Sequence, residues 1–367
     1  MKEENMQAEA CPVNSHNEWD PLEEVIVGRL DKATVPTNHI LFMGMLPKAA
    51  ARLYWWLAGH PYPKMFRKRA QKELDEFVHV LTAEGITVRR PDVMDFTRTF
   101  KTPCWKSRGF TSACPRDLTL IVGDHMIEGA SGWRARYFEP HVYRTLFQEY
   151  YNKGARWSAA PKPQLKDSFY DYTYTQPKPG EPVRYIINED EPVWDAADFV
   201  RCGRDLFVTR SNVTNLSGIN WVRRHLGDEY RIHEIESRCT VPMHIDTTFM
   251  PLAPGKVLVN PEFIDVKRLP PILKSWDILV APDKDPIPRS IPTFYLSLVS
   301  GWVGLNVLML DEKRVVVEKS QVSMVKALKD WGFEPITLPF LNGKMFGGGF
   351  HCFTLDVRRT GGLQSYF

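Results

Sequence analysis

Four polar clusters in this chain hold residue types that can carry chemistry, and each stands where an apolar run meets a loop. They are Cys114-Pro-Arg-Asp117, Trp194-Asp-Ala-Ala-Asp198, Met243-His-Ile-Asp246 and Gly347-Gly-Gly-Phe-His-Cys352. His244 and Asp246 are two residues apart, so they would share one face of an extended strand. Three successive glycines allow a left-handed backbone and close approach, so the last loop can present Cys352 to a ligand.

Together the four clusters suit nucleophilic attack by a cysteine on a cationic carbon. Asp117, Asp198 and Asp246 would bind a guanidinium or amidinium group, which offers several planar N–H donors. Carboxylates near a thiol also raise its pKa above the usual range. We therefore expect the thiolate of Cys352 to form mainly in the complex with a positively charged substrate.

Most of these residues also have an ordinary structural explanation. An isolated aspartate before a strand, such as Asp117, is usually a turn or cap residue, and His225 and His233 are more typical of the surface or the core edge. Four other cysteines, at positions 11, 104, 202 and 239, are typical of small buried apolar side chains.

Cys352 needs a basic partner, and two histidines are candidates. His351 precedes it directly, but neighbours in a strand point to opposite faces, so we expect His244 to be the partner. A zinc site built from Cys352, His244 and Asp246 would lack a fourth ligand, so we predict no metal site.

A repeated unit of amphipathic helix, short turn and apolar strand must position these clusters. Helices are expected over 66–81, 143–151, 216–226 and 264–273 and after a Ser320 cap, and strands follow them at 86–88, 155–158, 230–235, 276–281 and 333–338. Short paired strands are expected between the units at 118–123, 125–128, 205–209, 256–260, 305–310 and 314–317. In the fifth helix, Val322, Val325 and Leu328 should be buried. About five αβ units result, which fit a doubly wound sheet or a closed propeller.

Composition excludes several classes of protein. The 367 residues are 43% hydrophobic and 25% charged, which excludes a disordered chain, a collagen-like fibre and a coiled coil. Lys plus Arg number 47 against 44 Asp plus Glu, so the net charge of +3 gives no electrostatic case for binding nucleic acid or an anionic membrane.

The cysteine content and the apolar segments indicate a cytoplasmic protein. Six cysteines are too few for a disulfide scaffold in a chain of this size, and the first residues carry no signal for export. The apolar segment 40–59 is interrupted by Pro47, Lys48 and Arg52, so we expect a buried or lid-like helix there rather than a membrane span.

Runs across nearly the whole chain resemble the glycine amidinotransferases of the guanidino-group-modifying superfamily. The matching runs lie at 17–29, 88–91, 115–117, 195–198, 243–246, 306–314, 347–352 and 356–359. The resemblance implies an α/β fold, a five-bladed α/β propeller (pentein) of pseudo-fivefold ββαβ modules. It also implies a single domain over residues 1–367, where length alone would suggest two.

The resemblance further implies a ping-pong transfer of an amidino group from L-arginine to a primary amine, without metal or cofactor. By position, Cys352 matches the nucleophile that becomes S-amidino-cysteine. His244 matches the general acid–base, which protonates the departing L-ornithine and later deprotonates the acceptor. Family members are often dimeric, so a homodimer is expected.

The remaining site residues are also carried over by position. Asp198 and Asp246 match the carboxylates that hold the guanidinium and orient the histidine. Asp117 matches a third carboxylate at the substrate, and Ser300 matches a hydroxyl near the substrate's α-carboxylate. Met243, beside the histidine, is expected to contact the substrate.

Two positions depart from the family pattern. Phe263 stands where the arginine:glycine enzymes place the Arg that binds the donor carboxylate, so Lys267, Arg268 or another cation should compensate. Val241 stands where the glycine-using enzymes carry Asn, which argues for an acceptor larger and more apolar than glycine. We expect an enzyme of the bacterial natural-product branch, such as a toxin pathway.

Three alternatives remain open. The chain could be an arginine:glycine amidinotransferase, or a hydrolase of the arginine deiminase type in which water replaces the acceptor amine. A non-catalytic propeller, like the ribosome anti-association factor of the same architecture, need not keep Cys352, His244 and Asp198 together.

Overall fold

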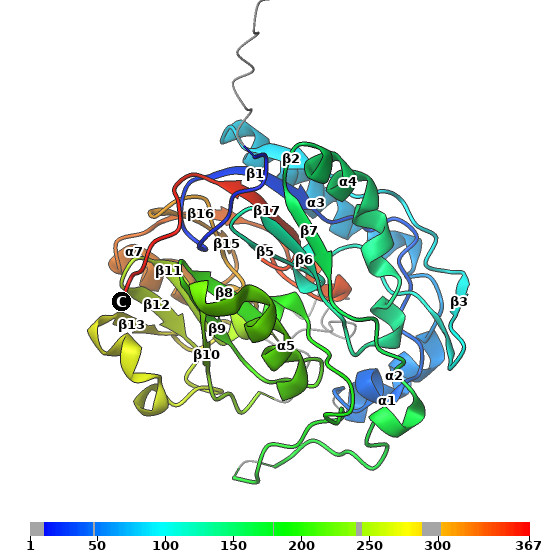
Figure 1. Cartoon of the computed structure of the whole chain (residues 1–367). Coiled ribbons are helices and arrows are strands. Elements are labelled where there is room, and N and C mark those ends of the chain that lie inside the picture. The colour runs from blue at the N-terminus through cyan, green and yellow to red at the C-terminus, as the bar shows by residue number, and fades with distance from the viewer. Residues whose placement is uncertain (1–10, 47, 179, 240–243, 288–301) are drawn as a thin grey trace, which may run out of the picture.

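The computed structural model describes residues 11–367 except 47, 179, 240–243 and 288–301. Within these residues the chain forms five three-stranded sheets that lie side by side around the middle of the molecule (Figure 1). A separate hairpin joins β3 (Thr99–Lys101) and β4 (Lys106–Arg108).

The five sheets repeat one topology, in which the middle strand pairs antiparallel with the first strand and parallel with the third. In order they are β17 (Thr354–Arg359), β1 (Leu22–Val27) and β2 (Thr87–Arg89); β5 (Thr119–Val122), β6 (His125–Glu128) and β7 (Arg156–Ala159); β8 (Phe199–Cys202), β9 (Asp205–Val208) and β10 (Arg231–Glu234); β11 (Phe249–Ala253), β12 (Lys256–Val259) and β13 (Asp277–Val280); β14 (Leu308–Met309), β15 (Arg314–Glu318) and β16 (Glu334–Leu338). The first sheet takes its first strand from the other end of the chain, so β17 joins the two ends.

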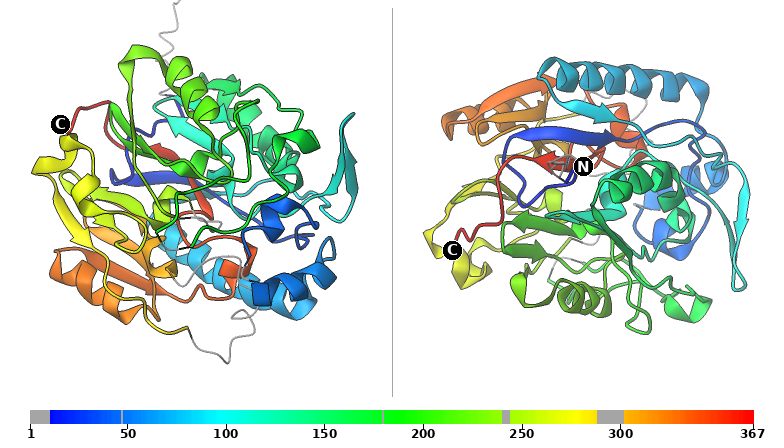
Figure 2. Two further views of the ribbon diagram at one scale, coloured as in Figure 1. Left: turned by 90° about the horizontal axis from the view of Figure 1, so that it is seen from below. Right: turned by 45° about the horizontal axis from the view of Figure 1, so that its top comes forward.

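Helices lie in the crossovers between the parallel strands, because two parallel neighbours cannot be joined by a tight turn. These helices are α1 (Ile40–Met43), α2 (Lys48–Leu57) and α3 (Lys64–Ala83) before β2, α4 (Arg144–Asn152) before β7, α5 (Leu216–Leu226) before β10 and α7 (Val322–Asp330) before β16. Figure 2 shows α3 along the outside of its sheet. The first strands β5, β8 and β11 are buried along their whole length, as expected of strands covered on both faces.

The predicted helices over 66–81, 143–151 and 216–226 are confirmed as α3, α4 and α5. The helix expected over 264–273 is wrong: that segment forms two 3-10 turns, Val266–Arg268 and Pro271–Ser275. Pro270 and Pro271 explain the difference, because proline lacks the N–H donor that an α-helix needs.

The fifth helix also differs from expectation at its start. Ser320 is not the cap, because its hydroxyl donates to Glu318, and the residue in the N-cap position is Gln321. Val322 is 63% exposed, whereas Met324 and Leu328 are buried. The apolar face is therefore rotated from the predicted one.

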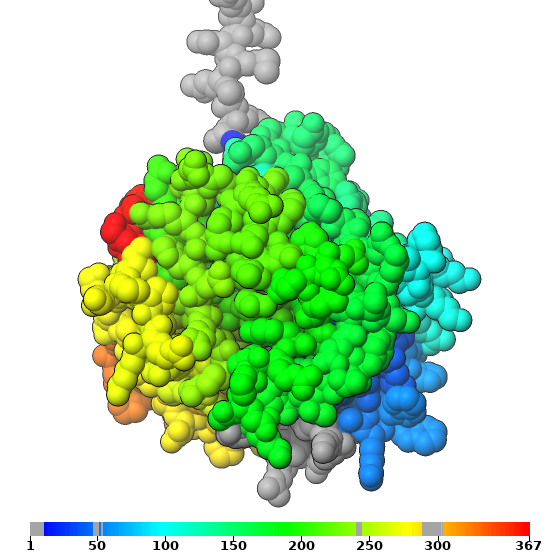
Figure 3. Space-filling view, turned by 60° about the horizontal axis from the view of Figure 1, so that its bottom comes forward, coloured from blue at the N-terminus to red at the C-terminus, as the bar shows by residue number. Residues whose placement is uncertain are grey.

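The segment 40–59 forms the two short helices α1 and α2 rather than one. Leu41, Phe42 and Tyr54 are buried, while Trp55 and Trp56 are 60% and 81% exposed. This blue part of the chain projects at the lower right edge in Figure 3. In the described residues, no helix has the length and apolar character that crossing a membrane requires.

A buried ionic cluster links β8, β17 and the segment that precedes β1. Arg201 on β8 donates to Glu18 at 2.8 and 2.7 Å and to Asp356 on β17 at 2.8 Å. Arg116 and Arg359 also donate to Asp356, at 2.5 and 2.8 Å. Burial raises the pKa of Asp356, but the three guanidinium groups outweigh it and hold the pKa well below the usual range.

Replacing Asp356 should therefore be costly to the fold. We expect Asp356→Asn to lower the free energy of unfolding at pH 7 by about 3–5 kcal/mol, because it leaves buried guanidinium groups without their charged partner. Since the pKa is lowered on folding, this contribution is present above about pH 4 and is lost as the pH falls through the lowered pKa.

Urea denaturation followed by circular dichroism measures this loss. Asp330→Asn is the matched control, because Asp330 pairs with Lys326 on the surface, where the loss should stay below about 1 kcal/mol. Equal losses in the two variants would contradict a structural role for the buried cluster.

Candidate active site

One local structure positions the candidate acids. Asp117, Asp198 and Asp246 lie in the 3-10 turns Pro115–Asp117, Ala196–Asp198 and Ile245–Thr247, which precede the first strands β5, β8 and β11. The first turn contacts the second, and the second contacts the third. A residue just before the first strand of one sheet therefore lies near its counterpart in the next.

The other two sheets contribute in the same way. Asn306 follows the 3-10 turn Val303–Leu305 and precedes β14, and Cys352 lies in the turn that precedes β17. Each of the five sheets thus offers polar or nucleophilic side chains ahead of its first strand, and the site forms where these turns meet.

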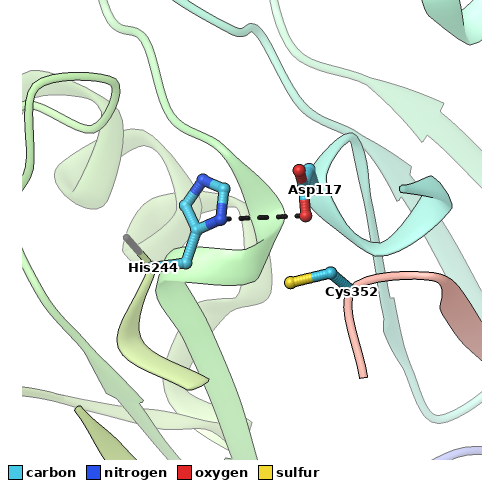
Figure 4. Close-up of side chains that lie close together, drawn as sticks. All are labelled: Asp117, His244 and Cys352. Atoms are coloured by element: carbon cyan, nitrogen blue, oxygen red, sulfur yellow. Dashed lines mark ion pairs between the residues drawn. The ribbon is translucent and has the colours of Figure 1, made fainter. Parts of the chain in front are cut away.

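Cys352, His244 and Asp117 come together at this point (Figure 4). One atom from each, the sulfur, a ring nitrogen and a carboxylate oxygen, lies within 4.8 Å of the other two. His244 Nδ1 is 3.7 Å from Asp117 Oδ1. The histidine that sequence reasoning favoured as the partner of Cys352 is thus beside it.

His244 contacts Asp195, which sequence reasoning did not single out. Its Nε2 lies 3.3 Å from Asp195 Oδ2, whereas Asp198, the residue expected to orient the ring, accepts a hydrogen bond from Ser211 Oγ at 2.6 Å. Both aspartates belong to the same matching run, and no pattern in the sequence distinguishes which one faces the histidine.

The acids hold His244 as an imidazolium ion. Burial lowers its pKa, but Asp117, the hydrogen bond to Asp195 and the charge of Asp198 outweigh this and raise it to about 10. Burial likewise raises the pKa of Asp198 to about 7, against the opposing effect of His244. At neutral pH the imidazole is a proton donor, and Asp198 is close to its point of ionisation.

Cys352 is held in a protonated state. Burial is the largest cause, and the charges of Asp246 and Asp117 add to it, so the pKa of the thiol lies well above its usual range. The S–H donates to Asp246 Oδ2 at 3.4 Å, and Asn306 Nδ2 donates to the sulfur at 3.1 Å. The raised thiol pKa is the one expected of a cysteine among carboxylates.

Steric constraints explain the glycines that precede Cys352. Gly347 has a φ of +104°, in the left-handed region, and a Cβ on Gly348 would lie 2.3 Å from the Cβ of Cys352. A side chain at Gly348 would therefore displace the sulfur from its place beside Asp246.

The backbone around His351 differs from the strand that the sequence suggested. Residues 350–353 form a turn rather than a strand, so the alternation of side chains along a strand does not apply to His351 and Cys352. His351 Nδ1 lies 2.8 Å from Asp246 Oδ2, the same oxygen that the thiol contacts. His351 Nε2 lies 3.2 Å from Glu18 Oε2.

A buried arginine, which sequence reasoning also missed, fixes the acids from behind. Arg136 donates to Asp117 Oδ2 at 2.5 Å and to both oxygens of Glu139 at 2.8 and 3.0 Å, and lies 3.8 Å from Asp195 Oδ2. Arginine is common, so only its position in the fold marks it as part of the site.

Four buried carboxylates of the site each keep one oxygen that makes no hydrogen bond to the described residues. These oxygens are Oδ1 of Asp117, Asp195, Asp198 and Asp246. A buried acceptor without a donor is costly, so such oxygens are unusual unless a ligand supplies the donors. A planar guanidinium, with five N–H donors, has the matching chemistry.

Cys352, His244 and Asp117 are also residue types that bind zinc, and their spacing would admit a metal ion. The carboxylate oxygens that make no hydrogen bond to the described residues also match the N–H donors of a cationic organic ligand. The absence of a metal site stays a prediction.

The other predicted substrate-binding residues are Val241, Met243, Ser300 and Phe263. Val241, Met243 and Ser300 fall outside the described residues. Phe263 is half-buried and lines a cavity of about 310 Å³ with Arg238 and Glu262. Arg268, a candidate to compensate for Phe263, is paired with Glu236 at 2.7 Å.

Asp198 should destabilise the folded protein at neutral and alkaline pH. Because folding raises its pKa from 3.8 to about 7, the penalty is absent below about pH 4 and complete above about pH 7. As the pH rises from 5 to 8, we expect the free energy of unfolding of Asp198→Asn to increase by about 2–3 kcal/mol relative to that of the unsubstituted protein.

Thermal unfolding at pH 5 and pH 8 tests this expectation. Asp205→Asn is the contrasting control: burial raises the pKa of Asp205, but His233 and Arg231 outweigh it, so removing that charge should lower stability at pH 8. A pH-independent loss of stability in Asp198→Asn would contradict a raised pKa of Asp198 in the folded protein.

Similar proteins are found over the whole chain, although no family model matches. L-arginine:L-lysine amidinotransferase of Pseudomonas savastanoi pv. phaseolicola is 45% identical over 100% of this chain and 99% of its own length. Mitochondrial glycine amidinotransferase of Danio rerio is 42% identical over 98% of this chain and 86% of its own.

Solved structures agree with these relatives. SxtG, an amidinotransferase from Microseira wollei in the saxitoxin biosynthetic pathway, is 56% identical, with a TM-score of 0.93 over 97% of this chain and all of that one. Dimethylarginine dimethylaminohydrolase, at 13% identity and a TM-score of 0.56 over 91% of this chain and 99% of its own, shows the shared α/β pentein fold alone. With whole-chain identities of 42–56% to enzymes of one activity, the chain belongs to the amidinotransferase family.

Proposed function

We propose that the protein transfers the amidino group of L-arginine to a primary amine through an S-amidino-cysteine, and releases L-ornithine in the first half of a ping-pong cycle. The observation that carries this proposal is the set of four buried carboxylates, each with one oxygen that makes no hydrogen bond to the described residues, around the thiol of Cys352 and the imidazolium of His244. The relative that uses L-arginine and L-lysine supports the donor.

Binding of the donor supplies the missing charge. The guanidinium donates N–H bonds to Asp117, Asp198 and Asp246, whose unpaired oxygens are buried. A cation beside the sulfur favours the thiolate, so it offsets the burial and the carboxylates that hold the pKa of Cys352 high. The nucleophile therefore forms when its substrate is present.

The first half-reaction breaks the bond between the guanidino carbon and Nε of arginine. The thiol of Cys352 releases its proton to solvent as the donor binds, the thiolate attacks the carbon, and His244 gives its proton to the departing nitrogen, which leaves as the δ-amino group of L-ornithine. Asp195 and Asp117 favour the imidazolium from which this proton comes.

The second half-reaction reverses these roles. Neutral His244 takes a proton from the acceptor amine, whose nitrogen attacks the amidino carbon, and the sulfur leaves as the thiolate. The S-amidino group keeps a positive charge, so the same carboxylates stabilise it while the acceptor replaces ornithine.

We also propose that the acceptor is larger and more apolar than glycine and that the enzyme serves a bacterial natural-product pathway of the toxin-forming kind. Val241 in place of a polar residue supports the acceptor class, and so does the relative that uses L-lysine. The similarity to SxtG supports the pathway class.

The fold is proposed to be a single five-bladed propeller domain over residues 1–367. Five sheets of one topology and the pairing of β17 with β1, which joins the chain ends, support it. The homodimer and the cytoplasmic location stay predictions from the sequence.

Incubation with L-arginine alone tests the covalent intermediate. We expect an adduct of about 42 Da, one amidino group replacing a hydrogen, on the peptide that contains Cys352. Cys352→Ala should abolish it, and Cys202→Ala, which removes a buried cysteine on β8, should leave it intact. The adduct should also form in EDTA.

The same incubation separates transfer from hydrolysis. Citrulline formed from arginine without any amine would support the deiminase alternative. Failure of the protein to form an adduct with arginine would contradict the proposed intermediate.

A screen of acceptors tests the proposed amine. We expect lysine or a longer alkylamine to exceed glycine in kcat/KM by about tenfold or more, since each methylene in an apolar pocket contributes about 1–3 kcal/mol of discrimination. Ornithine release at fixed arginine measures the rates. Glycine reacting as well as the longer amines would contradict the acceptor class.

A further inference from the structure

His351 joins two carboxylates that lie far apart in the sequence. Its Nδ1 is 2.8 Å from Asp246 Oδ2, and its Nε2 is 3.2 Å from Glu18 Oε2. All three side chains are about 1% exposed. The ring is the direct link between the substrate-facing acid and the buried ionic cluster around Glu18.

Each ring nitrogen of His351 faces one carboxylate oxygen. A ring nitrogen that carries hydrogen donates to the carboxylate that it faces. Burial raises the pKa of Asp246, but the hydrogen bond and electrostatic effect of His351 outweigh it and lower that pKa. The ring of His351 therefore bridges the two carboxylates.

Asp246 is shaped by this contact. Its Oδ2 accepts from His351 at 2.8 Å, from Asn306 Nδ2 at 2.9 Å and from the S–H of Cys352 at 3.4 Å. Its Oδ1 makes no hydrogen bond to the described residues. Three donors on one oxygen fix the carboxylate plane and leave the other oxygen for a ligand.

Glu18 gives the ring of His351 a rigid support. Arg201 donates to both oxygens of Glu18, and Arg116 lies 3.4 Å from Oε2, the oxygen that faces His351. Burial raises the pKa of Glu18, but Arg201, His351 and Arg116 outweigh it and lower it well below the usual range. Glu18 therefore presents a fixed negative charge to the ring.

We propose that His351 is a positioning residue: anchored by Glu18, it orients the Asp246 carboxylate so that one oxygen holds Cys352 and the other binds the donor guanidinium. This inference rests on the proposed amidino transfer. It places no substrate contact on His351, which acts through Asp246.

Two substitutions separate the two ends of the ring. The amide nitrogen of Asn lies near the place of Nδ1, so His351→Asn keeps a donor for Asp246. The amide nitrogen of Gln lies near the place of Nε2, so His351→Gln keeps the donor for Glu18 and loses the one for Asp246. Both replacement side chains are neutral and polar, and they differ in whether they preserve the donor to Asp246 or the donor to Glu18.

The measurement is the rate of amidino-enzyme formation against arginine concentration. We expect His351→Gln to lower kcat/KM for arginine about 10–100-fold, mainly through KM, because it loses a hydrogen bond to a charged group in the binding site. His351→Asn should stay within about fivefold of the unsubstituted enzyme. The matched control is His233→Gln, because His233 on β10 also contacts a carboxylate, that of Asp205 on β9, at 2.7 Å.

A purely structural role gives a different result. The two His351 variants would then lose thermal stability together, and the folded fraction would react with arginine at the unsubstituted KM, which would overturn the proposal. Glu18→Gln gives a second route if His351→Gln does not fold: removing the charge that supports the ring should raise KM about three- to tenfold, and an unchanged KM would also overturn it.

Different outcomes contradict the amidino transfer and the positioning role of His351. Absence of any adduct in the unsubstituted enzyme would contradict the amidino transfer itself. A normal adduct in the unsubstituted enzyme, together with an unchanged KM in His351→Gln, would leave the transfer intact and reject the positioning role.

Discussion

The ion pair between Arg201 and Glu18 is the interaction on which the rest of this structure depends. It is fully buried, and Arg201 also reaches Asp356 on β17, so β8, β17 and the segment before β1 are held by one guanidinium. Breaking one member of such a cluster costs more than its formation gains, because the remaining charges stay buried. The cluster therefore sets the position of the turn that carries His351 and Cys352, and with it the distance from the nucleophile to the acids on the neighbouring sheets.

The site is built at a cost to stability. Four carboxylates are buried close to one another, and burial raises the pKa of Asp117 and Asp198 even with Arg136 and His244 nearby. An enzyme tolerates such repulsion when the substrate relieves it, because the free energy stored in the empty site is returned on binding. A cationic donor relieves it best, because it supplies both hydrogen bonds and positive charge to the carboxylates, whereas a neutral molecule supplies hydrogen bonds alone.

Periodicity predicted the elements better than it predicted the contacts. The helices α3, α4 and α5 follow from regular apolar spacing, whereas Pro270 and Pro271 break the segment in which a fourth helix was expected. The sequence also indicated Cys352 and His244 as partners. It did not separate Asp195 from Asp198, and it did not find the contact of His351 with Asp246, because both depend on the local turns Ala196–Asp198 and 350–353. Arg136 and Asn306 are common residue types whose importance arises only from their contacts.

The protonation states explain how the thiol stays inert until the donor binds. In the free protein the raised pKa values make Cys352 a thiol beside the imidazolium of His244, whereas many cysteine nucleophiles rest as a thiolate beside an imidazolium. A guanidinium bound among the acids shifts the balance at the sulfur, because it adds positive charge where the carboxylates oppose the thiolate. The imidazolium then already holds the proton that the leaving amine requires. In the proposed mechanism, nucleophile and acid are thus prepared by the same set of carboxylates, and the order of events follows from charge: the cation binds first, the sulfur ionises second, and the proton of His244 is used last.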